Sequence, residues 1–209
     1  SAAHGWCGRT WTRLTEGPAE KVFAIWTESR PTATVRALGE NGVLEGVKDT
    51  WRRLPPPAGT RFDSGGVGRE ASTGSARIYA TAVLSRDASG KTAGGIYVST
   101  DNGASWLEAN AGLSRFVSAG PVAGETWGPA RGSRPRFGPI GASARNGLSA
   151  YVGVRGLREG GPGSKPFNGV ARTADGGRSW SIVHRESDGP APNFTASWIE
   201  TRGSENSQS

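Results

Sequence analysis

The side chains best suited to catalysis in this 209-residue sequence are carboxylates in segments rich in glycine and proline. Asp63, Glu125 and Asp188 are the candidate catalytic residues. Two carboxyl groups at a fixed separation can protonate a leaving oxygen and activate water, as in glycoside hydrolysis. Trp127 follows Glu125 closely, and an exposed indole can stack on the apolar face of a sugar ring. The alternative is that these carboxylates are solvated loop side chains.

Three arginines, Arg131, Arg134 and Arg136, form the only local cluster of basic residues, and with Trp127 they are the predicted ligand-binding residues. The net charge of +7 raises the question of an acidic partner. The other basic residues are scattered, with no basic stripe interleaved with aromatics, so no nucleic-acid partner is expected. The charge then belongs either to an anion site at the cluster or to an ordinary solvated surface.

Motifs for metal, phosphate and disulfide chemistry are missing from the sequence. There is no HExxH and no phosphate-binding glycine loop followed by lysine, and the two histidines, His4 and His184, are far apart. A single cysteine, Cys7, excludes a disulfide within the chain. We therefore predict no cofactor and no metal site. No apolar run is long enough to predict a membrane span, and the start without methionine favours a processed product or an excised fragment.

One turn sequence occurs twice, as STDNGASW at residues 99–106 and as TADGGRSW at residues 173–180. Its aspartate can accept hydrogen bonds from the backbone amides that follow, and its glycine supplies a positive φ. The closing tryptophan can anchor the turn against neighbouring strands. Two coincidental Asp-Gly hairpins are the alternative. The predicted structural residues are Ser99, Asp101, Gly103, Trp106, Thr173, Asp175, Gly177 and Trp180.

The SxDxGxSW pattern of these turns resembles the Asp-box, or BNR repeat, of β-propellers such as sialidases, xyloglucanase-type glycoside hydrolases and sortilin-type receptors. The resemblance implies an all-β fold of four-stranded blades. In this family the motif joins the third and fourth strands, on the face opposite the usual active site. A composition of 33 Gly and 13 Pro also indicates many turns rather than long helices.

Thr-Trp pairs at Trp11 and Trp51 predict two degenerate copies of the turn. The closing tryptophans then divide a single partial propeller into blade units of approximately 12–51, 52–106 and 107–180, with partial blades at 1–11 and 181–209. A four-stranded blade takes about 40–45 residues, so the second and third units carry insertions.

Apolar and alternating segments predict the strands of each unit. Second strands are expected at 21–29, 77–85 and 149–155, and the strands that lead into the turns at 33–38, 95–99 and 169–173. An innermost strand is expected at 137–142 and an outer strand at 181–185.

Four Gly/Pro-rich segments are predicted to be loops on the face opposite the turns, where the resemblance places ligand binding. Long loops commonly carry binding sites, although they can also be decoration without function. The segments are 55–70, 114–136, 156–168 and 186–193.

Three whole blades and two partial ones are fewer than the six or more that propellers of this family usually have. Closure of a four-bladed ring by pairing the two chain ends is the alternative, but such a ring would be strained. We therefore expect the missing blades to come from another chain or from the rest of the same gene product. A partner blade should cover the sheet faces at both ends.

Two functions follow from the resemblance. The first is a portion of a secreted, carbohydrate-active or carbohydrate-binding propeller of glycoside-hydrolase type, with a glycan as ligand and an extracellular or periplasmic location. The second is a non-catalytic propeller scaffold for protein-protein assembly. A carboxylate pair facing across the channel, with an aromatic beside it, would favour the first.

Overall fold

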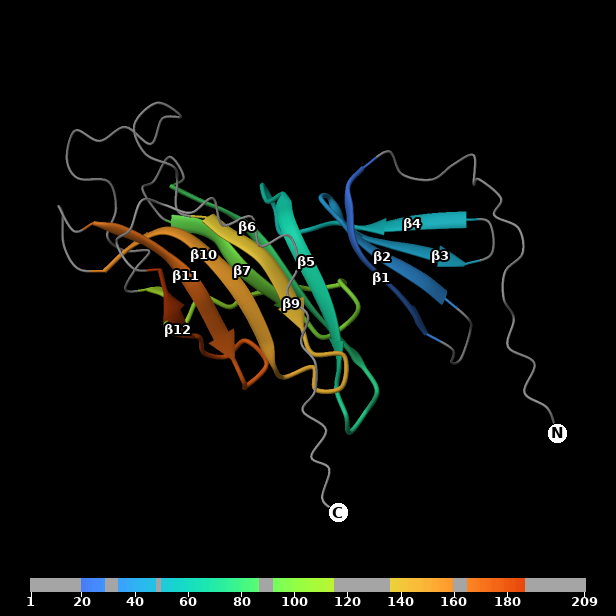
Figure 1. Ribbon diagram of the computed structural model, residues 1–209. Coiled ribbons are helices and arrows are strands. Elements are labelled where there is room, and N and C mark those ends of the chain that lie inside the picture. The colour runs from blue at the N-terminus through green and yellow to red at the C-terminus, as the bar shows by residue number, and fades with distance from the viewer. Residues whose placement is uncertain are drawn as a thin grey trace, which may run out of the picture.

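Twelve β-strands form three four-stranded sheets in the computed structural model, which describes residues 20–28, 34–47, 50–86, 92–114, 136–159 and 165–186. All neighbouring strands are antiparallel. The prediction of an all-β fold of four-stranded units is confirmed. The arrangement is propeller-like, and the three sheets do not close into a ring (Figure 1).

Each sheet is a meander whose strands lie side by side in chain order. The first sheet contains β1 (Val22–Glu28), β2 (Thr34–Gly39), β3 (Gly42–Val47) and β4 (Thr50–Leu54). The second contains β5 (Phe62–Arg69), β6 (Ala76–Arg86), β7 (Thr92–Ser99) and β8 (Leu107–Glu108). The third contains β9 (Arg136–Ala142), β10 (Ala150–Arg158), β11 (Pro166–Thr173) and β12 (Ser181–Arg185).

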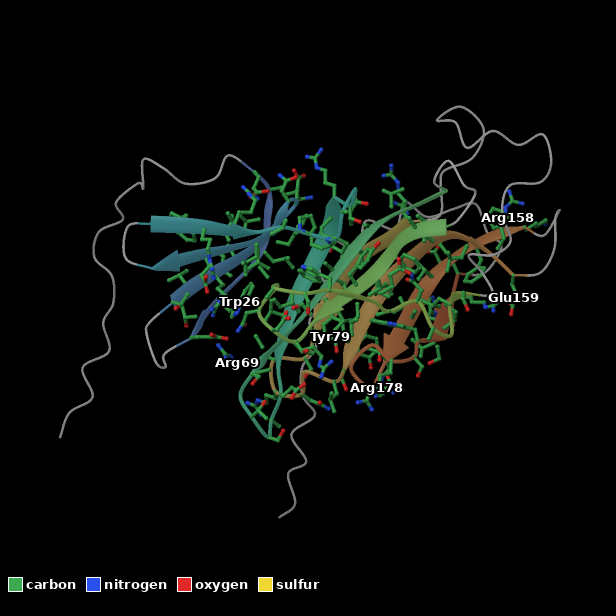
Figure 2. All side chains as sticks on the ribbon, turned by 180° about the vertical axis from the view of Figure 1, so that it is seen from behind. Trp26, Arg69, Tyr79, Arg158, Glu159 and Arg178 are labelled. Carbon is green, nitrogen blue, oxygen red and sulfur yellow. The ribbon has the colours of Figure 1, made fainter. Side chains whose placement is uncertain are left out.

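The second sheet lies between the other two and buries both of its faces. Alternate residues of a strand point to opposite faces, and in β6 Ile78 and Ala80 belong to a core cluster shared with the first sheet, whereas Tyr79 between them belongs to a cluster shared with the third. Leu84 also belongs to this second cluster, because the register of β6 shifts between Ala82 and Ser85. Trp26 of the first sheet contributes to the former cluster, and Figure 2 labels both Trp26 and Tyr79. The hydrophobic core therefore consists of two interfaces between sheets.

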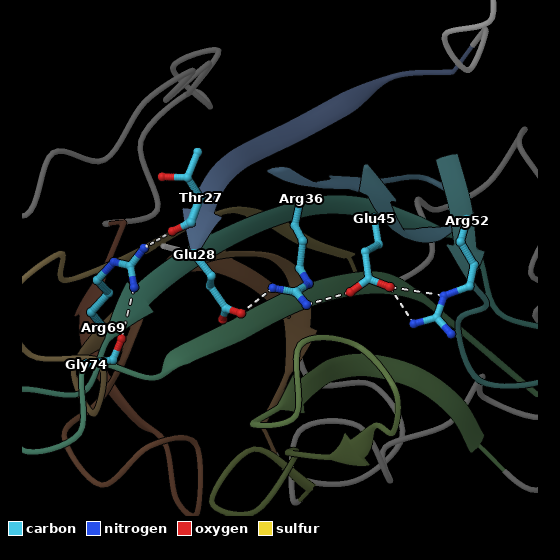
Figure 3. Close-up of polar contacts among 7 residues, drawn as sticks. All are labelled: Thr27, Glu28, Arg36, Glu45, Arg52, Arg69 and Gly74. Carbon is cyan, nitrogen blue, oxygen red and sulfur yellow. Dashed lines mark hydrogen bonds and ion pairs between the residues drawn. The ribbon is translucent and has the colours of Figure 1, made fainter. Parts of the chain in front are cut away.

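A row of alternating charges crosses the first sheet at one of these interfaces (Figure 3). Arg36 of β2 is only 9% exposed and forms ion pairs with Glu28 of β1 and Glu45 of β3. Glu45 also accepts a hydrogen bond of 3.0 Å from Nε of Arg52 in β4. Burial raises the pKa of Glu45, but its hydrogen bonds with Arg52 and Arg36 outweigh this and leave the pKa lowered.

Arginine side chains also connect the sheets to one another. Arg69 of β5 donates hydrogen bonds to the carbonyl oxygen of Thr27 in β1, at 2.6 Å, and to that of Gly74, at 2.9 Å (Figure 3). Arg77 of β6 donates to the carbonyl oxygen of Gly176, at 3.1 Å, and pairs with Glu70. One arginine thus links the second sheet to the first, and another links it to the third.

In the first sheet, the predicted place of each strand in the strand order was wrong by one strand. Residues 21–29 and 33–38 were expected to be its second and third strands, but they correspond to β1 and β2, and β3 is the third strand. Because β3 ends at Val47 and β4 begins at Thr50, with only positions 48 and 49 between them, no eight-residue turn fits there. The outer strand at 181–185 and the innermost strand at 137–142 are confirmed as β12 and β9.

The prediction of a loop over residues 55–70 was also wrong, because β5 occupies Phe62–Arg69. The segment at 156–168 is shorter as a loop than predicted, since β10 continues to Arg158 and β11 begins at Pro166. Counted with their outer strands, the sheets span residues 22–54, 62–108 and 136–185. Trp11, Cys7 and the segment 115–135 lie outside the described residues.

Candidate functional site

A cavity of about 710 Å³ opens where the innermost strands of the three sheets meet. Its walls consist of residues 21–24, 63–67, 136–142 and 155. These segments include β1, β5 and β9, the first strand of each sheet, together with one residue of β10. The cavity thus occupies the position of the central channel in a propeller-like arrangement.

Glycines in β5 allow these innermost strands to approach one another closely. A Cβ atom on Gly66 would lie 2.8 Å from the carbonyl oxygen of Ile140, and one on Gly68 would lie 2.6 Å from that of Ser143. A Cβ atom on Gly65 would collide with the side chain of Leu38. Glycine inside a strand often marks a site of close backbone approach. The same glycines had indicated a loop from the sequence.

Four charged side chains line the cavity, and three of them are cations: Lys21, Arg136 and Arg155. All three cations are exposed. The fourth is Asp63, the only carboxylate among the described lining residues. Asp63 is exposed too, but partial desolvation at the cavity raises its pKa, and the charges of Arg136 and Lys21 offset part of that rise.

Phe23 gives the cavity an aromatic wall. Its side chain is partly buried against the core cluster shared by the first and second sheets, and it also lines the cavity. The Lys21 ammonium lies 5.4 Å from the centre of the Phe23 ring. An aromatic ring beside a carboxyl group and several cations can bind a polar ligand that has one apolar face.

The structure brings together two of the predicted site residues. Asp63 and Arg136 line the same cavity, although both were expected in loops and both lie in strands. The remaining candidates lie outside the described residues: Glu125, Asp188, Trp127, Arg131 and Arg134.

Three residues of the cavity were missed from the sequence: Lys21, Phe23 and Arg155. Arg155 carries a weak signal, because it interrupts the apolar alternation of β10. Lys21 and Phe23 carry none, because residues 21–29 were assigned as a second strand, and a second strand does not border the channel.

The two repeated turns have the same hydrogen-bond pattern. In the first, Oγ of Ser99 donates to Asp101 at 2.8 Å and accepts from the amide of Gly103 at 2.8 Å. In the second, Oγ1 of Thr173 donates to Asp175 at 2.8 Å and accepts from the amide of Gly177 at 3.0 Å. The aspartate in turn accepts from the amide and the hydroxyl of the serine four residues on.

These bonds stabilise the charged form of each turn aspartate. The hydroxyl of Ser179 is the main cause that lowers the pKa of Asp175 to about 2. Burial raises the pKa of Asp101, but hydrogen bonds from Ser105 and Ser99 leave it lowered. Neither aspartate lines the cavity. Both turns therefore use their carboxylates to hold the backbone.

The tryptophans that close the turns differ in burial. Trp180 is 3% exposed and makes an edge-on contact with Tyr79, with ring centres 6.2 Å apart. Trp106 is only partly buried and lies 4.8 Å from the ring of Phe62. Each packs in the cluster that its sheet shares with the preceding sheet.

The described residues hold no group of three or more His, Cys, Asp and Glu side chains that could bind a metal ion. In the same part of the chain, no helix is long and apolar enough to cross a membrane.

Fold and cavity together define an all-β protein of four-stranded antiparallel sheets in a propeller-like arrangement, with a charged cavity at the innermost strands. The sequence matches no protein-family model, and a comparison with curated proteins gave no match.

Proposed function

We propose that this chain is part of a secreted Asp-box β-propeller whose central cavity binds a carbohydrate. The observation that carries the proposal is the cavity walled by the innermost strands of all three sheets and lined by Phe23, Asp63 and three cations. Sugar rings combine apolar C–H faces with hydroxyl groups, so they suit a wall that offers an aromatic ring and hydrogen-bonding groups.

Binding is better supported than hydrolysis. Glycoside hydrolysis needs two carboxyl groups at a defined separation, and Asp63 is the only carboxylate among the described lining residues. A catalytic version of the proposal requires a second carboxylate, for which Glu125 and Asp188 are the candidates. Release of reducing sugar by the parent protein, lost in Glu125→Gln or Asp188→Asn, would establish catalysis.

The binding proposal is tested with a glycan array followed by calorimetric titration of the best saccharide. Phe23→Leu keeps an apolar side chain but removes the aromatic face, and should weaken binding by about two- to tenfold, since aromatic contacts contribute about 0.5–1.5 kcal/mol beyond area burial. Leu107→Ala is the control, because Leu107 is exposed on β8 and does not line the cavity. Equal affinity of Phe23→Leu and the parent would contradict the assigned site.

A separate observation favours association with further blades. Val22, Ile25 and Val35 lie on the face of the first sheet that points away from the second sheet, and Ile25 is 69% exposed. We propose that another four-stranded sheet packs there, as the first sheet packs on the second. In light scattering, Ile25→Asp should then reduce association of the chain, and an unchanged distribution of masses would refute this.

A further inference from the structure

Two arginines face each other across neighbouring strands at the cavity. Arg136 of β9 and Arg155 of β10 are register partners in the third sheet. Side chains at directly opposed positions have Cβ atoms about 4.5–5.5 Å apart, and like charges there destabilise a sheet. Both arginines are exposed and both line the cavity. The fold therefore maintains an unfavourable pair of like charges at its central opening.

The described surroundings do not neutralise this pair. No ion pair joins either arginine to a described carboxylate, and Lys21 adds a third positive charge to the lining. Among the described lining residues, Asp63 is the only opposing charge. The lining therefore has an excess of positive charge, and a bound anion would remove the repulsion.

The arrangement of acceptors indicates what kind of anion fits. One guanidinium fork is enough to engage both oxygens of a planar carboxylate. A carboxylate holds its acceptor sites in one plane, whereas the three terminal oxygens of a sulfate or phosphate monoester present acceptors in several directions. A tetrahedral ester can therefore accept hydrogen bonds from both arginines at once.

We propose that Arg136 and Arg155 bind a sulfate or phosphate ester of the ligand, which makes the ligand an anionic, ester-substituted saccharide. This inference rests on the proposed carbohydrate binding in the cavity. Lys21 adds electrostatic attraction, and Asp63 accepts hydrogen bonds from hydroxyl groups next to the ester.

The test compares four oligosaccharides of the same length: sulfated, phosphorylated, uronate-containing and neutral. Each is titrated calorimetrically into the full chain at one fixed salt concentration. The sulfated or the phosphorylated sugar should bind at least about tenfold more tightly than the neutral sugar, which lacks a charged acceptor, and than the uronate, whose planar carboxylate is engaged by one guanidinium fork. Comparison of the sulfated with the phosphorylated sugar identifies which ester is preferred.

Arg136→Gln and Arg155→Gln should each remove most of the preference for the ester, measured as the ratio of ester affinity to neutral-sugar affinity within the same variant. Arg145→Gln is the matched control, because it removes the same charge from the β9–β10 connection outside the cavity. Without ligand, Arg155→Gln should melt at a higher temperature than the parent, since it relieves the repulsion. A lower melting temperature together with equal loss of all four sugars would show that Arg155 is only structural.

The outcomes separate this inference from carbohydrate binding itself. Equal affinity for all four sugars overturns the ester site and leaves carbohydrate binding intact. If inorganic sulfate or phosphate binds as tightly as the substituted sugar, the anion site is supported, but the proposal that its ligand is a saccharide is overturned. Binding of none of the probes overturns both.

Discussion

Gly177, in the turn after β11, lies against Val98 of β7, so that a Cβ atom on Gly177 would be 2.7 Å from Cγ2 of Val98. Gly103 has the same relationship to Val43 of β3, where a Cβ atom would also collide. Each repeated turn thus packs against the third strand of the preceding sheet. The turns therefore contribute to contact between sheets as well as to local backbone geometry.

Gly177→Ala should destabilise the fold in two ways. Gly177 has a φ of +88°, which costs an alanine about 1–2 kcal/mol, and the contact with Val98 adds about 1–3 kcal/mol of overpacking. Gly74→Ala is the control, because Gly74 has a φ of +71° with nothing within 4 Å of its added Cβ. Urea unfolding of both variants measures the difference, and equal losses would show that the turn does not pack tightly on β7.

Trp180→Ala should lower the free energy of unfolding by about 3–5 kcal/mol, since the indole is buried against Tyr79. Trp106→Ala should cost less, because Trp106 is only partly buried. Chemical denaturation followed by far-UV circular dichroism avoids the loss of tryptophan fluorescence. A larger loss for Trp106→Ala would contradict the packing of the two indoles.

Asp175→Asn should cost about 1 kcal/mol, because the carboxamide replaces one of the two acceptor oxygens. The pKa of Asp175 in the folded protein, about 2, is below its ordinary value of 3.8, so the carboxylate contributes stability above pH 3.8 that disappears as the pH falls towards 2. Urea midpoints should therefore fall less steeply over that interval in the variant than in the parent. Saccharide affinity at neutral pH should not change.

Asp63 should show the opposite pH dependence. Burial raises the pKa of Asp63 in the folded state, so ionisation costs stability as the pH rises above its ordinary value of 3.8. Asp63→Asn should therefore raise the urea midpoint at neutral pH, and the gain should vanish in acid. A variant less stable than the parent at neutral pH would show that attraction from Arg136 and Lys21 exceeds the cost of burial.

Arg36→Gln should cost about 3–5 kcal/mol, because it leaves Glu28 and Glu45 without their shared buried partner. Arg52→Gln removes the exposed end of the same charge row and should cost less than about 1 kcal/mol. Urea unfolding of the two variants therefore compares the loss of a buried arginine with the loss of an exposed arginine in the same charge row. Similar losses would mean that burial of Arg36 does not strengthen its ion pairs.

The sequence predicted the third sheet and most of the second because each repeated turn marks where the third strand of its sheet ends. In the first sheet no repeated turn follows β3, and the local sequence pattern does not distinguish a first strand from a second. The assignment of 55–70 was wrong because glycine has two roles. Gly65, Gly66 and Gly68 were interpreted as loop residues, whereas in β5 they make room for neighbouring sheets.

The cavity could be predicted only in part, because it depends on how separate sheets meet. Asp63 and Arg136 could be selected by residue type alone. The opposition of Arg136 and Arg155 depends on the strand register set by the turn between β9 and β10, and the sequence does not fix that register. Lys21 and Phe23 reach the site through the packing of β1 beside β5, a contact between different sheets.

The burial of both faces of the second sheet has a consequence for cooperativity. Each core cluster joins sheets that are consecutive in the chain, so stability resembles a row of units coupled to their nearest neighbours. A unit at the end of such a row has one coupling to lose, and the central unit has two. In the isolated chain, with no further sheet packed on the first, the first and third sheets can therefore open while the remaining pair stays folded, and the amide hydrogens of β6 and β7 exchange only when the whole row comes apart.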